Sequence, residues 1–410
     1  MKKTLLRKYA RLIAVMGARP RKGQWVIVTA EPDQPDFVAM VVEECYRAGA
    51  GKVTVEWDYQ ALTKIHTRYQ TVKTLSTVEK WQTEKLELMC NTLPARVYLI
   101  SEDPDGLNGI NMGKHSKGQQ NRYKIIKPYR DRMENKYQWT IAAVPGERWA
   151  RKVFPGLRAA AAMEKLWQAI LATCRVDEES DPIENWKRHN MNLQARCDHL
   201  NSLGLRSLHY TAANGTDLTV GLIDNALFMG GDEELPESGI RFNANIPSEE
   251  VFVTPMRGKA EGIVYSSKPF SYRGQMVENF SIRFENGKAT EVKAEVGQEL
   301  LQTMIGMDEG AAYLGEVALV PFESPINRCG FLFLNTLFDE NAACHLALGA
   351  GFSNCIRDYE SYTLEQCREM GINDSMIHED FMIGTADLRI VGIDRDGKEH
   401  PIFDRGTWAF

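Results

Sequence analysis

The sequence predicts an α/β N-terminal domain with a parallel sheet, followed by an α+β C-terminal catalytic domain built largely on antiparallel sheet. The first half contains a strand–helix–strand pattern, the unit from which parallel sheets are assembled. The second half changes to short strands separated by turn residues, which favours antiparallel pairing. An acidic, polar stretch at 177–181 separates the strand–helix–strand pattern from the pattern of short strands. We therefore predict two domains, 1–180 and 181–410.

The elements of the first domain follow from hydrophobic periodicity. A basic amphipathic helix comes first, and its buried stripe consists of Leu5, Leu6, Tyr9, Leu12 and Ile13. After it we predict, in chain order, a strand at 24–30, a helix at 37–48, strands at 52–57, 96–100 and 138–144, and a helix at 157–174. The turn after the first strand has no glycine fingerprint, so dinucleotide binding is not expected.

The second domain begins with a long helix and continues with strands. The helix is predicted at 182–203, and a shorter one at 297–307. Asn286-Gly287 separates two alternating runs, which is a strong signal for a hairpin. The predicted strands are 207–211, 218–222, 250–254, 262–265, 278–285 and 288–296.

Composition and charge are those of an ordinary soluble globular protein. The chain is 43% hydrophobic and 25% charged, with a net charge of −6, which gives no reason to expect a nucleic-acid partner. No apolar run reaches the ~18 residues that a membrane span needs. The short apolar run at 12–16 does not have the length of a signal-peptide core. We expect a cytoplasmic protein without a membrane partner.

The eight cysteines are dispersed, and no two form a C-x-x-C pair. This spacing argues against a zinc knuckle, a redox motif and a disulfide framework. Cys344 stands beside His345 and could suggest a nucleophile, but we interpret it as a packing residue.

Candidate metal ligands are scattered between positions 250 and 380. They are Glu250, Glu316, His345, His378 and Asp380. Each lies among apolar or small residues, where burying an unpaired charge is costly. Five such groups converging on one place would bind two divalent cations, which makes a metallohydrolase the leading hypothesis.

The local sequence leaves two interpretations open both for the His378–Asp380 pair and for Glu316. His378 and Asp380 are two apart, so in a strand their side chains share a face. A histidine paired with an aspartate at a surface turn explains the same motif. Glu316 begins a strand at 316–320, either as a solvated strand end or as a buried anion with a cation partner.

Of the neighbours Glu249 and Glu250, alternation sends only one to a given face of the strand at 250–254. We choose Glu250, which shares its face with Phe252 and Thr254.

His345 is predicted to lie on a short helix at 341–349, with Asp339 as its N-cap and Gly349 as its C-cap. A histidine on a helix rich in alanine and leucine is more often a core residue than a ligand. The small neighbours would, however, let the helix approach a crowded metal centre.

The donor set points to particular metals and to hydrolysis. Imidazole and carboxylate ligands suit zinc, cobalt or manganese, and the lack of thiolates argues against a structural zinc site. Two such ions ~3.5 to 4 Å apart lower the pKa of bound water and polarise a carbonyl. Glu250 or Glu316 would also handle protons in catalysis. One ion could hold the free amine of a substrate, which would make the enzyme an exopeptidase.

Four strings occur in an order that resembles a known family. They are NIPSEEVFVTP, LGEVALVP, HLALGAGF and H-x-D-FMIG, and the N-terminal GQWVIVTA, GAGKVTVEW and VPGERWARKVFPG also fit. The sequence is similar to the metal-dependent aminopeptidases that include aminopeptidase T, aminopeptidase S and thermophilic leucyl aminopeptidases. The resemblance covers most of the chain. It implies a homodimeric exopeptidase with a two-metal centre in the C-terminal domain, with the five residues above as ligands and Glu316 as the bridge.

One position departs from the family pattern. Members commonly have a tyrosine seven residues after the histidine of the third string, and here that residue is Phe352, which has no hydroxyl to stabilise an oxyanion. The alternative is a non-haem iron(II) dioxygenase that opens aromatic rings, with His345, His378 and Asp380 as a 2-His-1-carboxylate triad. The substrate would then be a small molecule instead of a peptide.

Overall fold

The computed structural model describes residues 1–272 and 275–410. These residues form two compact units, which are described separately. Unit 1 comprises Met1–Arg188 and Asp232–Pro247, and unit 2 comprises His189–Gly231 and Ser248–Phe410. The division falls inside helix α9 (Pro182–Ser202). The domain limits at 180/181 stay a prediction. None of the helices in the described residues is long and apolar enough to cross a membrane.

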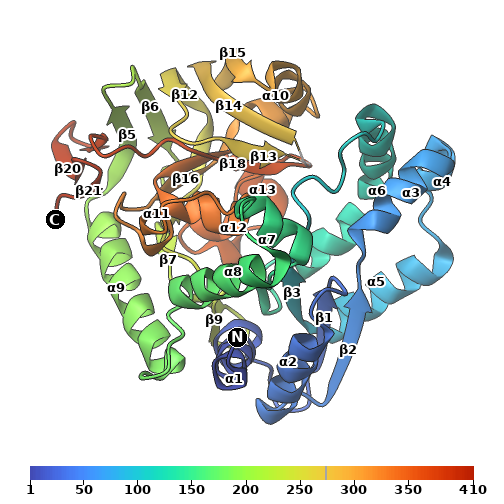
Figure 1. Ribbon diagram of the computed structural model, residues 1–410. Helices are drawn as coiled ribbons and strands as arrows, with labels where there is room; N and C mark the ends of the chain where they lie inside the picture. Colours follow the sequence, from blue (N-terminus) through green and yellow to red (C-terminus); the bar gives the residue numbers. More distant parts are fainter. Residues whose placement is uncertain (273–274) are drawn as a thin grey trace. The chain divides into compact units, whose positions relative to one another are not determined.

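Unit 1 is built on a parallel sheet with the strand order β10-β4-β3-β1-β2. Its strands β1, β2 and β3 are labelled in Figure 1. The edge strand β10 comes from the later segment of the unit and pairs parallel with β4. The parallel sheet predicted from the sequence is therefore confirmed. The strands are β1 (Trp25–Ala30), β2 (Lys52–Trp57), β3 (Ala95–Ile100), β4 (Trp139–Ala143) and β10 (Asn245–Ile246).

Helices pack against this sheet through apolar clusters. Ile27 of β1 contacts Met89 of α5 and Met133 of α6. A second cluster joins α1, α2 and α8, where the rings of Phe37 and Trp167 lie 5.3 Å apart. The helices are α1 (Lys3–Leu12), the π-helical turn η1 (Ile13–Ala18), α2 (Pro35–Arg47), α3 (Gln60–Tyr69), α4 (Val72–Ser76), α5 (Lys80–Thr92), α6 (Met112–Met133), α7 (Glu147–Val153) and α8 (Ala159–Thr173). Helices α3 to α7 are not among the elements predicted from the sequence.

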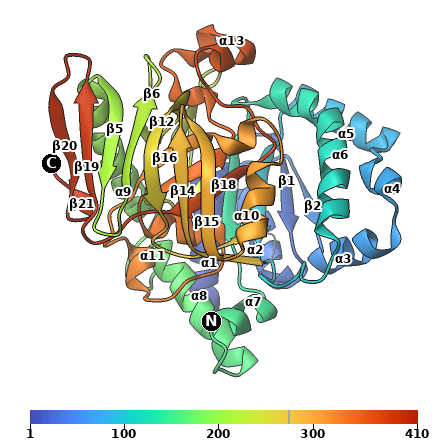
Figure 2. The same ribbon diagram turned by 90° about the horizontal axis from the view of Figure 1, so that it is seen from above.

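The larger sheet of unit 2 is antiparallel and runs in the order β13-β14-β12-β6-β5-β19-β20-β21, with β15 also pairing with β14 (Figure 2). The predicted Asn286-Gly287 hairpin is confirmed, because Glu285 pairs with Lys288 where β14 turns into β15. The strands are β5 (Leu205–Thr211), β6 (Asp217–Leu222), β12 (Pro255–Tyr265), β13 (Phe270–Tyr272), β14 (Gln275–Glu285), β15 (Lys288–Val296), β19 (Arg389–Asp394), β20 (Glu399–Asp404) and β21 (Thr407–Trp408).

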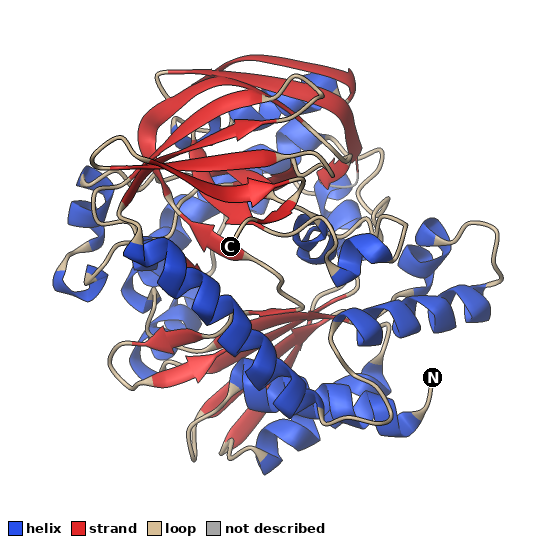
Figure 3. Cartoon of the chain, turned by 90° about the vertical axis from the view of Figure 1, so that its left-hand side faces the viewer, coloured by secondary structure: helices blue, strands red, loops and turns tan. Residues whose placement is uncertain are grey.

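A smaller antiparallel sheet of unit 2 has the order β18-β17-β16-β11-β7. One core joins the two sheets, since Val317 and Leu346 of the smaller sheet cluster with Val220 and Phe284 of the larger one. Figure 3 shows how strongly strands dominate this part of the chain. The strands are β7 (Met229–Gly230), β11 (Val251–Val253), β16 (Leu314–Leu319), β17 (His345–Gly349) and β18 (His378–Met382).

Short helices connect these strands, and a small hairpin lies in unit 1. The hairpin is β8 (Glu233–Leu235) with β9 (Ile240–Phe242). The connecting helices are α10 (Gln298–Ile305), η2 (Gly310–Ala312), α11 (Pro325–Arg328), α12 (Thr336–Asp339), η3 (Glu340–Ala342), η4 (Ser353–Cys355), η5 (Tyr359–Ser361) and α13 (Leu364–Glu369).

The predicted helix around His345 is wrong. Residues 345–349 form strand β17, which pairs with β16 on one side and β18 on the other. Asp339 ends α12 and precedes the short turn η3, and its carboxylate accepts from the N–H groups of Phe333 and Asn335 instead of capping a helix. Gly349 is the last residue of the strand. Alanine and leucine favour helices, but every residue of β17 is buried, and pairing in the sheet interior overrides that propensity.

Candidate metal centre

The five candidate ligands lie on one face of the smaller sheet of unit 2. Glu316 in β16 pairs with Ala347 in β17, and Ala347 pairs with Asp380 in β18. Paired residues of antiparallel strands share a face, and so do residues two apart along a strand. His345 and His378 therefore lie on the same face as Glu316 and Asp380.

Glu250 joins this face from the residue before β11. Phe252 pairs with Ala318, which is two positions from Glu316. The same alternation carries Glu250 to the side of Phe252. Its neighbour Glu249 is sent to the other side, although it is also buried.

Small residues between the ligands leave room for a cluster. Ala347 stands between Glu316 and Asp380, and Gly349 stands opposite His378. Gly349 has φ 107°, and a Cβ at this position would lie 2.1 Å from the carbonyl oxygen of Ile377. Only glycine fits there, because the backbone conformation and the close approach both exclude a side chain.

Each histidine is fixed through Nδ1 and presents Nε2 to carboxylates. Nδ1 of His378 lies 2.7 Å from the carbonyl oxygen of Ala350, which requires Nδ1 to donate. Nε2 of His378 lies 2.9 Å from Glu316 and 3.4 Å from Asp380. A backbone carbonyl on one ring nitrogen is the arrangement that orients a metal-binding imidazole.

His345 is arranged in the same way, more loosely. Its Nδ1 lies 3.4 Å from the carbonyl oxygen of Ala343. Its Nε2 lies 3.3 Å from Glu250 and 3.9 Å from Asp380. The side chain of His345 is 1% exposed. Its Nε2 therefore faces these carboxylates and not solvent.

A further buried carboxylate, Glu340, belongs to this cluster and is not predicted from the sequence. It lies on η3 and is buried. Burial raises the pKa of the Glu340 carboxyl well above its ordinary value, and the charges of Asp380, Glu250 and Glu316 raise it further. The run Asp339-Glu340-Asn341 resembles a polar turn in the sequence, and only its burial beside the other acids marks Glu340 out.

The pKa shifts in the cluster record an excess of negative charge. Burial raises the pKa of Glu316, and the contact with His378 only partly offsets this. Burial alone would lower the pKa of His345, but Glu250 and Asp380 raise it to about 9. The pKa of His378 is likewise raised well above its ordinary value, against the effect of burial, by Asp380 and Glu316. Positive charge is strongly favoured at this place.

The residues present fit two divalent cations. Ligand atoms of Glu250, Glu316 and His345 lie within 4.8 Å of one another, and those of Glu316, His378 and Asp380 do so too. Oδ1 of Asp380 is buried and accepts no hydrogen bond. A buried carboxylate oxygen without a donor is costly unless a cation is its partner.

Asn341 ties two parts of this site together. Its Oδ1 accepts the backbone N–H of Glu249 at 2.7 Å, next to Glu250. Its Nδ2 donates to the carbonyl of Leu337 at 3.1 Å and to Glu340 at 3.3 Å. Asn341 is fully buried, so one side chain fixes both the start of β11 and the orientation of Glu340.

Phe352 forms an apolar wall beside the cluster. Its ring centroid lies 4.9 Å from that of His378 and 5.6 Å from that of Phe252. Its N–H donates to Oγ1 of Thr254 at 2.8 Å. The position that departs from the family pattern is therefore close to a candidate ligand, and it offers an aromatic face there without a hydroxyl.

Comparison with known proteins gives consistent results over the full chain. Aminopeptidase AmpS of Bacillus subtilis (strain 168) is 39% identical over 406 residues, which cover 99% of this chain and 98% of that protein. Aminopeptidase T of Thermus thermophilus is 38% identical, with 98% of each chain covered. The solved structure of wild-type AmpT from Thermus thermophilus superposes with a TM-score of 0.89 at 36% identity and covers 100% of both chains.

A more distant solved structure shares the fold alone. The 2,5-dihydroxypyridine dioxygenase from Pseudomonas putida KT2440 matches with a TM-score of 0.50 at 12% identity, covering 99% of this chain and 96% of that one. The model of the thermophilic metalloprotease family M29, in contrast, matches residues 2–408. The chain belongs to the M29 family of thermophilic metalloproteases.

Proposed function

We propose that this chain is a metal-dependent aminopeptidase that uses two divalent cations to remove N-terminal residues from peptides. One observation supports this most: buried carboxylates and imidazoles form two groups of possible ligands that share Glu316. The aminopeptidases of Bacillus subtilis and Thermus thermophilus, which match over nearly the whole chain, support the choice of reaction.

Charge balance favours two cations over one. Glu250, Glu316 and Asp380 carry three negative charges when ionised, and the buried Glu340, whose pKa its neighbours hold well above its ordinary value, adds a fourth once cations offset the charge of those neighbours. Protonation of both histidines would balance half of this charge, whereas two divalent cations balance all of it. In the proposal Glu250, Glu316 and His345 hold one cation, and Glu316, His378 and Asp380 hold the other. Zinc, cobalt or manganese suits this donor set.

The chain's own residues would orient the metals and move protons. Bound divalent cations would supply a water of lowered pKa and polarise the scissile carbonyl. An Oε atom of Glu250 or Glu316 would accept the proton of the attacking water and return it to the leaving amine. The backbone contact of His378 would keep its Nε2 directed at Glu316 throughout.

The iron(II) dioxygenase alternative finds less support in this arrangement. Its triad of His345, His378 and Asp380 would have to bind one ion together. The two histidines instead fall into different ligand groups, and each group contains Glu316. The lack of a hydroxyl at Phe352 remains the feature that favours it.

We also propose that the protein is a homodimer and acts in the cytoplasm. Unit 1 exposes large apolar side chains on β2 and α3, which suits a surface covered by a second chain. These side chains are Trp57, Tyr59, Leu62, Ile65 and Tyr69. The cysteines are all free thiols, as expected in a reducing compartment. Light scattering of the purified protein tests the dimer.

The decisive experiment is release of free amino acids from short peptides by metal-stripped protein that is resupplied with cobalt, zinc, manganese or iron(II). Each peptide is tested with a free and with an acetylated N-terminus. We expect metal-restored cleavage of the free form only, because a free amine is what an aminopeptidase recognises.

Two results would contradict the proposal. Equal cleavage of the acetylated peptides would mean that the N-terminus is not recognised. No cleavage with any metal, together with oxygen uptake in the presence of iron(II) and a hydroxylated aromatic compound, would establish the alternative.

A further inference from the structure

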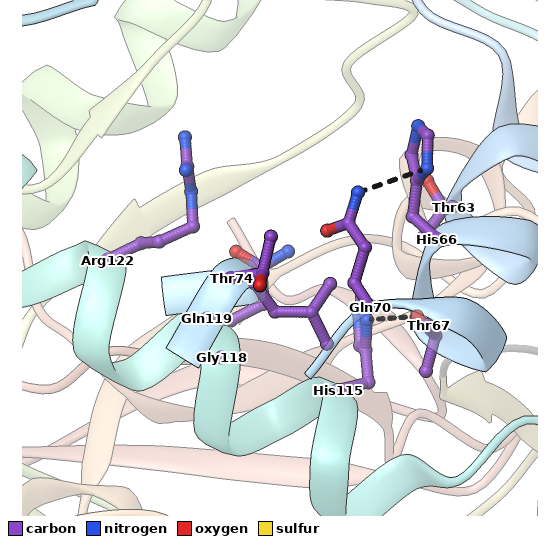
Figure 4. A pocket seen from close by; sticks show the side chains of 10 residues that line it. Thr63, His66, Thr67, Gln70, Thr74, His115, Gly118, Gln119 and Arg122 are labelled. Carbon is purple, nitrogen blue, oxygen red and sulfur yellow. Dashed lines mark hydrogen bonds between the residues drawn. The ribbon is translucent and has the colours of Figure 1, made fainter. Parts of the chain in front are cut away.

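Helix α3 in unit 1 exposes its apolar face and turns its polar face toward the protein, which is the reverse of the usual arrangement. Its apolar residues Leu62, Ile65 and Tyr69 are 46%, 49% and 78% exposed. The polar residues of α3 line a cavity of about 190 Å³ (Figure 4). They are Thr63, His66, Thr67 and Gln70, which follow the helical spacing i, i+3, i+4 and i+7. Surface helices ordinarily turn the apolar stripe inward. In α3 the apolar stripe faces outward, where the proposed second chain would cover it, and the polar stripe is left to line the cavity.

Helix α6 contributes a second polar stripe to the same cavity. His115, Gly118, Gln119 and Arg122 follow the same spacing along α6. Gly118 allows close packing, since a Cβ there would lie 2.8 Å from Cβ of Leu75 in α4. The cavity is completed by Thr74 and Leu75. Two helices thus direct polar faces at one space.

The lining is rich in hydrogen-bond donors and has no carboxylate. Among the ten lining residues are hydroxyl, amide, imidazole and guanidinium groups, but neither aspartate nor glutamate. Oγ1 of Thr67 lies 3.2 Å from Nδ1 of His115, and Nε2 of Gln70 lies 3.3 Å from Nδ1 of His66. Arg122 also donates to the carbonyl of Thr77 and keeps further donors.

The surrounding chain is strongly basic, although the protein as a whole is acidic. Residues 59–78 and 106–130, which contain α3, α4 and most of α6, include no aspartate or glutamate. They include nine lysines and arginines, whereas the net charge of the whole chain is −6. Asp58, Glu79, Asp105 and Asp131 directly border these stretches, and Lys127 pairs with Asp131 at 3.0 Å, so the excess of positive charge is limited to the segments that line the cavity. An excess of this kind favours anions over cations there.

We infer that the cavity between α3, α4 and α6 is a binding site for a small oxyanion, namely phosphate or the phosphoryl group of a small ligand. Arg122 supplies a charged fork that matches a tetrahedral oxyanion. The hydroxyls of Thr63, Thr67 and Thr74 and the amide of Gln119 supply neutral donors around it. The site is separate in chemistry from the metal cluster, which selects cations.

The test is a titration of the full chain, with its metals bound, with inorganic phosphate. Calorimetry gives the affinity, and imidazole resonances of His66 and His115 report where phosphate binds. We expect saturable binding that shifts both resonances. Arg122→Gln should weaken it about tenfold or more, because a charge-assisted contact is lost. Gln119→Glu, which keeps the side-chain shape and adds a negative charge, should weaken binding at least as much.

Arg130→Gln is the matched control, because it removes the same charge from an exposed position on α6 outside the cavity. It should change the affinity less than about twofold. The inference is overturned if no saturable binding occurs, or if Arg122→Gln and Arg130→Gln weaken it equally. It is also overturned if only the resonances of His345 and His378 shift, or if an oligonucleotide binds where phosphate does not.

Discussion

Each of two regions of the molecule contains a pair of histidines. The side chains around one pair are negatively charged, and those around the other pair are neutral or positively charged. His345 and His378 in unit 2 lie among buried carboxylates on a sheet. His66 and His115 in unit 1 lie among hydroxyl, amide and guanidinium groups beside helices. The imidazole is common to both regions, so it does not decide what binds. From this difference we expect that the charge of the neighbouring side chains determines whether a region binds a cation or an anion.

The largest expected effect comes from neutralising the carboxylate shared by both ligand groups. Glu316→Gln keeps the shape of the side chain but removes the charge that both candidate cations would contact. We expect loss of at least one metal per chain and a fall in peptidase kcat of about a thousandfold or more. Metal content by mass spectrometry and the rate of peptide cleavage check this.

Glu360→Gln is the control for that substitution, since Glu360 is an exposed glutamate of the same unit. It should leave metal content and rate unchanged. Phosphate binding in unit 1 should also be unchanged in Glu316→Gln. If phosphate affinity falls together with metal content, the two regions are not independent and the comparison fails.

An intermediate effect is expected from Asn341, which acts on the metal cluster through its neighbours. Asn341→Leu keeps the volume but removes the hydrogen bonds to Glu249, Leu337 and Glu340. We expect metal affinity to fall about ten- to a hundredfold, as for other residues that orient metal ligands. Calorimetric titration of metal-stripped protein measures it.

The matched control is Asn201→Leu. Asn201 also makes two hydrogen bonds to the backbone, both to Phe228. Both variants should unfold more easily, because each leaves buried backbone groups without partners. Only Asn341→Leu should lose metal affinity. If both variants lose metal affinity equally, Asn341 stabilises the fold and does not orient the metal ligands.

The smallest effect concerns a buried carboxylate that has no candidate cation site. Burial raises the pKa of Glu31 in unit 1 to about 7, the N–H of Gln60 partly opposes this, and nearby Glu102 and Asp58 raise it further. The folded state then binds a proton more tightly than the unfolded state. The contribution of Glu31 to the free energy of unfolding should therefore fall as the pH rises from about 4.5 to about 7, by roughly 1–3 kcal/mol, and stay constant above.

Denaturant unfolding at a series of pH values measures this fall. Glu31→Gln keeps the acceptor for Gln60 and should make the fall smaller, whereas the exposed Glu147→Gln should leave it unchanged. Asp339, whose pKa burial also raises to about 7, contributes to the fall in both variants. A wild-type profile that rises over the same range would contradict the assignment. Together with Glu316→Gln, the result would show that one unit neutralises a buried carboxylate with a proton and the other with metal ions.

Much of the fold can be predicted from sequence, because local signals there agree with the tertiary structure. The apolar run of β1, the strand–helix–strand pattern that leads to β2 and the Asn286-Gly287 turn require no distant partner to be recognised. The helix prediction at His345 is wrong because the local sequence favours a helix, whereas the segment pairs as a strand in the tertiary structure. That pairing depends on strands far away in the sequence. Helices α3 and α6 are missed for a related reason: their apolar and polar faces do not follow the usual pattern of burial.

The five candidate ligands can be predicted from sequence as a set, but not their arrangement. Glu316 and Asp380 lie in one row only through the register of β16, β17 and β18. Glu340 cannot be distinguished from an acidic turn residue until the fold buries it. Their roles as ligands stay a prediction that the metal titrations test.

The row that joins Glu316, Ala347 and Asp380 has a consequence for biosynthesis. The strand that carries His378 and Asp380, β18, is synthesised after β16 and β17. Until it pairs with β17, one of the two ligand groups does not exist, and pairings between such distant segments form late because loop closure must come first. A nascent chain therefore lacks the candidate ligand group of Glu316, His378 and Asp380 until β18 has been made and has paired with β17.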